Sequence, residues 1–403
     1  MLTGTNLTYT KAYNTRIVFE TIRLFGPLSR ADVARQTDLT PQTVSNIVKR
    51  LMDTGLIQEG PKRQAGRGAP SVTLEVNPAG RYSIGLDLNR DHLTGVLVDL
   101  TGCMKERLFF ELDAPNPEEA IDLMASSAKQ LMESLNLTEE NLGGIGIGFP
   151  GPMEIRRNKV VTNLVNPKDF PNWNHVPVVD MLSSNIDVPI FLENNATAAA
   201  VGERRYGAGR HISSFLYTFF GAGLGGGLLL NNEFYEGYTG NAGEIGYLPF
   251  YGEPSPLSDS EQRHIGEHFN LTKLYKWLNQ NGVRVSRPDE LEALFDQKHP
   301  RFMEWLDKAK QMLAPAFMCV EHLIDPEVIF LGGRLPVPII EDMCKGISDV
   351  MPELRVEGKA TNPELRCATA GADAAALGAA TLPMFDLFAP EPRVLIKNKK
   401  KKD

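Results

Sequence analysis

A run of small polar and basic side chains recurs at helical spacing between residues 42 and 50. One face of such a helix carries Gln42, Ser45, Asn46 and Lys49, at positions i, i+3, i+4 and i+7, with Thr43 and Arg50 beside it. No acidic residue falls on this face. Amide side chains pair with base edges in the major groove, whereas hydroxyls and cations contact phosphates. The pattern therefore predicts DNA recognition, with these six residues as candidate contacts.

A glycine-rich loop, GPKRQAGRGAP at 60–70, adds two further candidate DNA contacts, Arg63 and Arg67. An arginine on a slim backbone fits a narrow minor groove, where A·T-rich DNA concentrates negative potential. A solvated loop without a DNA role is the alternative. The neighbouring polar helix favours DNA contact.

The surrounding sequence predicts the elements that would position these side chains. Apolar spacing predicts a helix over 11–25, and Ser29 and Thr40 can cap a second and a third helix. The β-rich segments 56–59 and 71–76 flank the glycine-rich loop. This part of the chain is thus expected to form a winged helix-turn-helix that binds double-stranded operator DNA. A small helical module for protein contact is the alternative.

Charge is distributed unevenly along the 403 residues, whose formal net charge is -8. The first 80 residues hold ten Lys and Arg against six Asp and Glu, and the remainder hold 32 against 44. A basic head on an acidic body fits nucleic-acid binding. No run approaches the roughly 18 apolar residues of a membrane span, and the start lacks a signal-peptide pattern. We therefore expect a cytoplasmic protein with no membrane partner.

Beyond residue 80 the pattern alternates between β-rich segments and longer helices. A hairpin at 82–100 precedes one set of helices and strands, and a second at 214–230 precedes another. An α/β fold of two related lobes with a cleft between them is expected. The expected domains are the head at 1–80, a first lobe at 81–193 with part of the C-terminal tail, a second, larger lobe at 194–385, and a tail at 386–403 with a disordered basic end.

Ordered motifs in the body resemble one known family. They are PGP at 150–152, ENNATAAAVGE at 193–203, GAGLGGG at 221–227, GNAGEIGY at 240–247 and GG at 332–333. Together with the winged head they make the chain similar to the ROK family, which joins bacterial sugar kinases and sugar-responsive repressors. The resemblance spans nearly the whole chain and implies an actin-like, two-lobed ATPase fold.

Two departures from the kinase pattern argue against phosphoryl transfer. The catalytic aspartate of the family is replaced by Asn195, and a carboxamide cannot act as a general base. The first phosphate loop, D-x-G-G-T in the kinases, is D-L-N-R-D at 87–91, so close backbone approach to a phosphate is lost. We expect no enzyme, no catalytic residue and no cofactor. An active sugar kinase with a regulatory head is the alternative, supported by the glycines at 221–227 and 332–333.

The zinc ligands of the family are also missing. The histidine of its E-x-G-H motif is Tyr247, and the loop GEPSPLSDSEQRHIGEH that follows holds no cysteine. His264 and His268 stand one helical turn apart but lack further soft ligands. No metal site is expected, and the four cysteines of the chain, far apart in sequence, predict structural thiols.

The resemblance also implies a set of sugar-binding positions. Amides and carboxylates suit this role because they pair with sugar hydroxyls, and Tyr247 offers a hydroxyl and a ring face. The implied contacts are Gly151, Asn163, Asn194, Asn195, Glu244, Tyr247 and Glu267. Phe170 or Trp173 could stack on a second sugar ring, although an aromatic that anchors a loop is the favoured alternative.

These observations together predict a transcriptional repressor of carbohydrate-utilisation genes. Its kinase-like body would bind a small-molecule sugar effector that changes operator affinity. Because one recognition helix offers few base contacts, we expect a homodimer or a dimer of dimers on a two-fold DNA site. A scaffold that binds another protein is a third possibility, with no sequence feature of its own.

Overall fold

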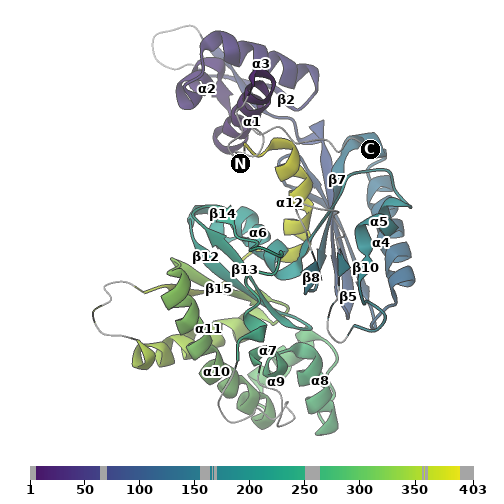
Figure 1. Ribbon diagram of the computed structural model, residues 1–403, viewed down its shortest axis with the longest axis vertical. Helices are drawn as coiled ribbons and strands as arrows, with labels where there is room; N and C mark the ends of the chain where they lie inside the picture. Colours follow the sequence, from purple (N-terminus) through teal and green to yellow (C-terminus); the bar gives the residue numbers. More distant parts are fainter. Residues whose placement is uncertain are drawn as a thin grey trace.

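The computed structural model describes residues 6–63, 70–154, 164–165, 167, 170–249, 264–355, 358 and 362–390. Its head lies at one end of the molecule, and the two lobes follow below it (Figure 1). The head consists of α1 (Leu7–Phe25), β1 (Leu28–Ser29), α2 (Arg30–Thr37), α3 (Pro41–Asp53), β2 (Ile57–Arg63) and β3 (Ser71–Val76). Its strands pair antiparallel in the order β1-β3-β2, which confirms the winged helix-turn-helix.

Capping residues fix where the two short helices of the head begin. The backbone N–H of Asp32 donates to Ser29 Oγ (3.2 Å), and the backbone N–H of Ser29 donates to the Asp32 carboxylate (3.1 Å). Thr40 Oγ1 accepts from the backbone of Thr43, and Pro41 takes the first position of α3. Each cap satisfies a donor that the first helical turn leaves open, so the start of each helix is set locally.

A five-stranded sheet forms the base of the first lobe, in the order β11-β7-β4-β5-β6. The strands are β4 (Tyr82–Leu88), β5 (His92–Asp99), β6 (Met104–Glu111), β7 (Leu142–Phe149) and β11 (Ile190–Asn194). Helices α4 (Pro117–Glu133) and α5 (Val178–Ser183) cover one face, and α12 (Ala374–Phe388) covers the other (Figure 1). The short strands β8 (Met153–Glu154), β9 (Leu164–Val165) and β10 (Val176–Pro177) form a small sheet beside it.

The second lobe repeats this plan with a sheet in the order β14-β13-β12-β15-β16. Its strands are β12 (Phe215–Phe220), β13 (Leu224–Leu230), β14 (Glu233–Phe234), β15 (Val328–Gly333) and β16 (Glu364–Cys367). The helices on its outer side are α7 (Ile265–His268), α8 (Leu271–Gln280), α9 (Pro288–Asp296), α10 (Pro300–Ile324) and α11 (Val337–Leu354). The two-lobed α/β architecture expected from the sequence is thus confirmed.

Two helices of small residues pack against each other between the sheets. Helix α6 (Asn195–Tyr206) covers the inner face of the second sheet, and α12 covers that of the first. Their backbones are in close contact, because a Cβ added to Gly378 of α12 would lie 1.7 Å from the carbonyl oxygen of Ala198 in α6. On the other side of α12, a Cβ on Gly146 of β7 would lie 1.9 Å from the carbonyl oxygen of Ala379.

Helix α12 packs on the sheet of the first lobe, on α6 and on the head, whereas the sequence assigned residues 194–385 to the second lobe and only part of the tail to the first. Its end carries the head: the rings of Phe388 and Phe19 stack at 4.4 Å, and Arg16 donates to the carbonyl oxygen of Ala389 (3.0 Å). Met384 of α12 lies in the apolar core of the head. Local pattern identifies this helix but not its partners, which come from distant segments. Among the described residues, no helix is both long and apolar enough to cross a membrane.

Candidate functional site

The polar face predicted for DNA recognition lies on the solvent side of α3. Gln42, Ser45, Asn46 and Lys49 are exposed, and Gln42 Nε2 donates to Asn46 Oδ1 (3.3 Å). The opposite face of α3 is buried in the core of the head, which fixes the direction of the polar face. The amide groups on this face are therefore available to base edges.

The flanking candidates lie in different surroundings. Thr43 is half-buried, and its hydroxyl is within 2.8 Å of the Thr40 hydroxyl. Arg50 is also half-buried and donates to Thr15 Oγ1 of α1 (3.1 Å), so its guanidinium braces the two helices. Arg63 is exposed at the end of β2, and Arg67 lies outside the described residues.

Three predicted sugar contacts meet at the start of α6. Asn194 caps this helix, with Oδ1 accepting from the backbone of Ala196 (2.8 Å). Its Nδ2 donates to Glu244 Oε1 (3.4 Å), which belongs to the second lobe. A Cβ on Gly151 would lie 2.6 Å from Glu244 Oε1 and 2.8 Å from Asn194 Nδ2. A larger residue at 151 would therefore collide with this polar pair, which glycine leaves uncovered.

Glu244 is the electrostatically perturbed member of this group. Burial raises its pKa to about 6, because the charged carboxylate loses contact with water. A sugar hydroxyl that donates to this carboxylate would replace part of the lost solvation. Glu244 is thus a buried hydrogen-bond acceptor. A polar ligand that donates to it would offset part of the free-energy cost of burying its charge.

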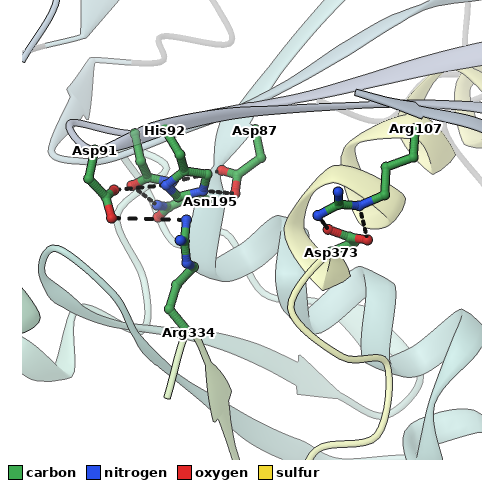
Figure 2. Close-up of polar contacts among 8 residues, drawn as sticks. Asp87, Asp91, His92, Arg107, Asn195, Arg334 and Asp373 are labelled. Atoms are coloured by element: carbon green, nitrogen blue, oxygen red, sulfur yellow. Dashed lines mark hydrogen bonds and ion pairs between the residues drawn. The ribbon is translucent and has the colours of Figure 1, made fainter. Parts of the chain in front are cut away.

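Asn195, the residue at the position of the kinase general base, is held within a polar network. Its Nδ2 donates to Asn89 Oδ1 (3.0 Å), and Asn89 Nδ2 donates to Asp87 Oδ1 (3.0 Å). Asp87 and Asp91 flank the buried ring of His92 on either side (Figure 2). The sequence pointed to the loop at 87–91 but not to His92. The signal that could have identified His92 is its position directly after this loop, at the start of β5.

The remaining sugar candidates lie on the wall formed by the second lobe. Tyr247 ends the short 3-10 helix Ile245–Tyr247 that follows Glu244, and its side chain is 43% exposed. Glu267 is buried in α7 and forms an ion pair with Lys273. A ligand that binds the Glu267 carboxylate would therefore share it with Lys273. The backbone N–H of Ile265 donates to the carbonyl of Leu248, which joins α7 to this segment. Asn163 lies outside the described residues.

Phe170 and Trp173 anchor a loop, which is the role that the sequence analysis favoured over stacking on a second sugar ring. Both rings are buried and pack on Phe149, with centroids 6.0 Å and 4.8 Å away. Trp173 Nε1 also donates to the carbonyl of Pro115 (2.8 Å). Their faces are therefore occupied by the protein itself.

No group of three potential metal ligands occurs among the residues that the structure describes. His264 Nδ1 interacts with the carbonyl oxygen of Tyr247 (3.0 Å), whereas His268 is buried beside Phe269. The two imidazoles thus have separate surroundings.

Comparisons with known proteins match the head and the body of the chain to two different families. Residues 83–384 match the ROK family, and residues 7–68 match the MarR family. The chain belongs to the ROK family. A ROK family transcriptional regulator described as a homolog of the E. coli MLC protein has the same fold, with a TM-score of 0.75 at 20% identity, covering 96% of this chain and 99% of that one. A ROK family glucokinase from Streptomyces griseus, solved with glucose and AMPPNP, gives 0.62 at 20% identity over 75% and 98%.

Two curated relatives of this ROK chain are named as regulators. The xylose repressor of Bacillus spizizenii is 31% identical over 241 residues, which is 60% of this chain and 61% of that protein. The DNA-binding transcriptional dual regulator NagC of Escherichia coli is 24% identical over 261 residues, 65% of this chain and 62% of that protein. The match therefore spans less than two thirds of the length of each.

The glycine motifs of this ROK chain have structural reasons of their own. Gly227 in β13 faces α6, where an added Cβ would lie 2.7 Å from Ala200 Cβ. Gly333 ends β15 with φ 105°, a conformation that favours glycine. Arg334 follows it and lies across the cleft from Asp91, with Nη1 3.9 Å from Asp91 Oδ2 (Figure 2). Sequence analysis missed Arg334, because an arginine after two glycines carries no local signal.

Proposed function

We propose that this ROK chain is a sugar-responsive transcriptional repressor. The observation that carries the proposal is the path of α6 and α12. Helix α6 begins at Asn194 and Asn195 in the candidate sugar site and packs along α12, and the end of α12 carries the head through Phe388 and Phe19. A ligand that shifts α6 would thus act on the support of the DNA-binding head.

The junction leaves room for the head to move. A cavity of about 1450 Å³ lies between α1, β11, α6, β14 and α12, and its lining extends to Glu193 and Thr197 beside Asn194. Arg23 of α1 and Arg205 of α6 both line it. Burial lowers the pKa of Arg205, and the neighbouring charge of Arg23 adds to this effect. Arg23 is also ion-paired with Glu20 of α1, so charged side chains line this junction on both the head and the body.

The proposed effector is a neutral sugar. Asn194, Asn195 and Glu244 provide amide and carboxylate groups that pair with hydroxyls. Two relatives, a xylose repressor and an N-acetylglucosamine repressor, carry names that support this ligand class. Tyr247 and Glu267 would complete the site on the second lobe and Gly151 on the first, and Asn163, which lies outside the described residues, is proposed as a further contact.

The proposed DNA target is a two-fold operator bound by a homodimer or a dimer of dimers in the cytoplasm. Gln42, Ser45 and Asn46 would contact base edges, and Lys49 would contact phosphate. Thr43, Arg50, Arg63 and Arg67 are proposed as flanking contacts. Because Arg50 already donates to Thr15, its effect would be mainly to orient α3.

We further propose that the body does not phosphorylate its sugar. Asn195 lacks a basic carboxylate, and its Nδ2 is engaged by Asn89. The hydroxyl that a kinase would activate is instead held by a hydrogen-bonded amide. No nucleotide or metal cofactor is required by this proposal.

The test joins ligand and DNA binding in one purified protein. A thermal-shift screen of neutral sugars identifies the effector, because a ligand that binds only the native state raises its apparent stability. Genomic fragments retained by the protein then supply the operator, and operator affinity is measured with and without the effector. The proposal expects a change of about 5- to 150-fold, the range of ordinary allosteric coupling. Equal operator affinities in both conditions would contradict it.

A further inference from the structure

Four charged side chains of alternating sign run from the first lobe to the second. They are Asp87, His92, Asp91 and Arg334, and together they are called the interlobe clasp. His92 Nε2 lies 3.3 Å from Asp87 Oδ2, and His92 Nδ1 lies 2.8 Å from Asp91 Oδ1. Arg334 Nη1, from the end of β15, lies 3.9 Å from Asp91 Oδ2 (Figure 2). The clasp therefore connects the β4–β5 hairpin with the second lobe.

The central His92 is suited to carry a charge. Both of its ring nitrogens face carboxylates, so both must bear hydrogen to satisfy them. Burial disfavours the imidazolium, but the hydrogen bonds to Asp87 and Asp91 outweigh it and raise the pKa of His92. With His92 protonated, the two positive and two negative charges of the clasp balance, as buried charges require.

Arg334 is held at the cleft by a ring as well as by charge. Its Cζ lies 5.5 Å from the centroid of Phe109 in β6, and its side chain is only 13% exposed. Its Nη1 has no hydrogen-bond partner among the described residues, and 3.9 Å to Asp91 is a charge contact rather than a hydrogen bond. The strength of this contact therefore depends on how closely the lobes approach each other.

The clasp also fixes the amides beside the sugar site. An ionised Asp87 can only accept hydrogen bonds, so Asn89 must direct Nδ2 toward it and Oδ1 away from it. Asn89 Oδ1 then accepts from Asn195 Nδ2, which leaves Asn195 Oδ1 for another donor. The orientation of Asn195 is thus set from the charged end of the network.

We propose that Arg334 is a positioning residue for the sugar site, acting through the interlobe clasp in place of a bound nucleotide. Asp91 stands in the loop that resembles the first phosphate loop of the kinases, at the position of their threonine, and its carboxylate would repel phosphates there. Arg334 supplies the cross-lobe charge instead. The cleft then binds sugar with Asn195 already oriented, and ATP has no effect on sugar affinity. This inference rests on the proposed function, because it assumes that the cleft binds sugar.

The experiment is a double-mutant cycle on Asp91 and Arg334 in the full-length protein. Sugar affinity is measured calorimetrically with D-xylose and N-acetyl-D-glucosamine for wild type, Asp91→Asn, Arg334→Gln and the double variant. We expect each single variant to lose about tenfold in affinity and the double variant to lose little more, because the two residues act as one pair. Arg334→Lys should keep affinity within about threefold, since it keeps the charge. Arg366→Gln, which removes an exposed pair with Glu364 in the same lobe, is the matched control.

The outcomes separate the clasp from the proposed function. The clasp would be overturned if the losses in sugar affinity of the two single variants added up in the double variant, or if each single variant bound sugar within twofold of wild type. The proposed sugar-responsive function would stand in both cases. A wild-type protein whose sugar affinity rises with ATP and Mg²⁺ would overturn the clasp as well. If neither sugar binds, the proposed effector class fails. The same double-mutant cycle is then applied to the free energy of unfolding, measured with urea. Absence of coupling there would then overturn the clasp.

Discussion

Asn194 Nδ2 lies 3.4 Å from Glu244 Oε1 and so joins the end of β11 in the first lobe to the segment after β14 in the second. The amide also caps α6 through Oδ1, which means that one side chain connects the cleft with the helix that leads to the head. A ligand that binds Glu244 competes with Asn194 or adds to it, and either event alters the restraint on α6.

Replacing Glu244 by glutamine should stabilise the protein while weakening its response to sugar. The raised pKa of about 6 means that the folded state holds the proton more tightly than the unfolded chain, so this stabilisation is complete below about pH 4.5 and is lost as pH rises through 6. At pH 7.5 the neutral variant should gain about 1 kcal/mol in the free energy of unfolding, because a shift of one unit corresponds to about 1.4 kcal/mol and partial exposure reduces the effect. Urea unfolding at pH 4.5 and 7.5 tests this, and a gain that is equal at both values would contradict the cause.

Sugar affinity should increase with pH between about 5 and 7. Hydroxyls that donate to the Glu244 carboxylate favour its ionised form, so binding releases a proton near the pKa of about 6. Calorimetry in buffers with different ionisation enthalpies measures this release directly. The Glu244→Gln variant has no such proton, and any residual pH slope in it would assign the effect to another group.

Single substitutions on α3 should separate base recognition from phosphate contact. Asn46→Ala should relax preference at one base position per half-site and cost about 1–3 kcal/mol on the preferred sequence. Lys49→Ala should weaken all sequences alike and lower the salt dependence of binding. Lys345→Ala, on the exposed face of α11, is the control. Gel-shift titrations at several salt concentrations measure both effects, and they would refute the assignment if the Asn46 and Lys345 variants behaved alike.

Removing the ring of Phe388 should uncouple the head from the sugar site. Its contact with Phe19 is a direct apolar link between α12 and α1, and neither ring is part of the DNA face or the sugar site. Phe388→Ala should retain sugar binding and operator binding, while the sugar-induced change in operator affinity falls toward onefold. Leu387→Ala, the exposed neighbour on α12, should retain that change. A full response in the Phe388 variant would place the coupling elsewhere.

Phosphoryl transfer should be absent even after the catalytic carboxylate is restored. Incubation of the effector with ATP and Mg²⁺ should give no sugar phosphate, and Asn195→Asp should give little, because the loop at 87–91 still lacks its glycines and the Asp91 carboxylate still opposes bound phosphates. The carboxylate introduced by this substitution would also face Asn89 Oδ1, an acceptor that cannot donate to it. Robust turnover by the unmodified protein would favour the kinase alternative.

Residues with strong local signals predicted much of this molecule. The capping residues Ser29 and Thr40 predicted α2 and α3 correctly, and the family motifs predicted that Gly151, Asn194 and Glu244 would meet. Strand β6 was missed because half of its sequence, MKERLFFE, is charged and most of it is exposed. The placement of α12 and the contact of Arg334 with Asp91 could not be predicted, since both depend on packing between segments far apart in the chain.

The seating of the head on α12 also limits how this protein could be recombined. Phe388 and the Ala389 carbonyl belong to the far end of the chain, yet they contact Phe19 and Arg16 of the first helix. In a chimera that exchanges only the N-terminal segment with another regulator, the foreign α1 would lack matching contacts with the end of α12. Functional transplants should therefore carry α1 together with the last turn of α12, so that the exchangeable unit is discontinuous in sequence.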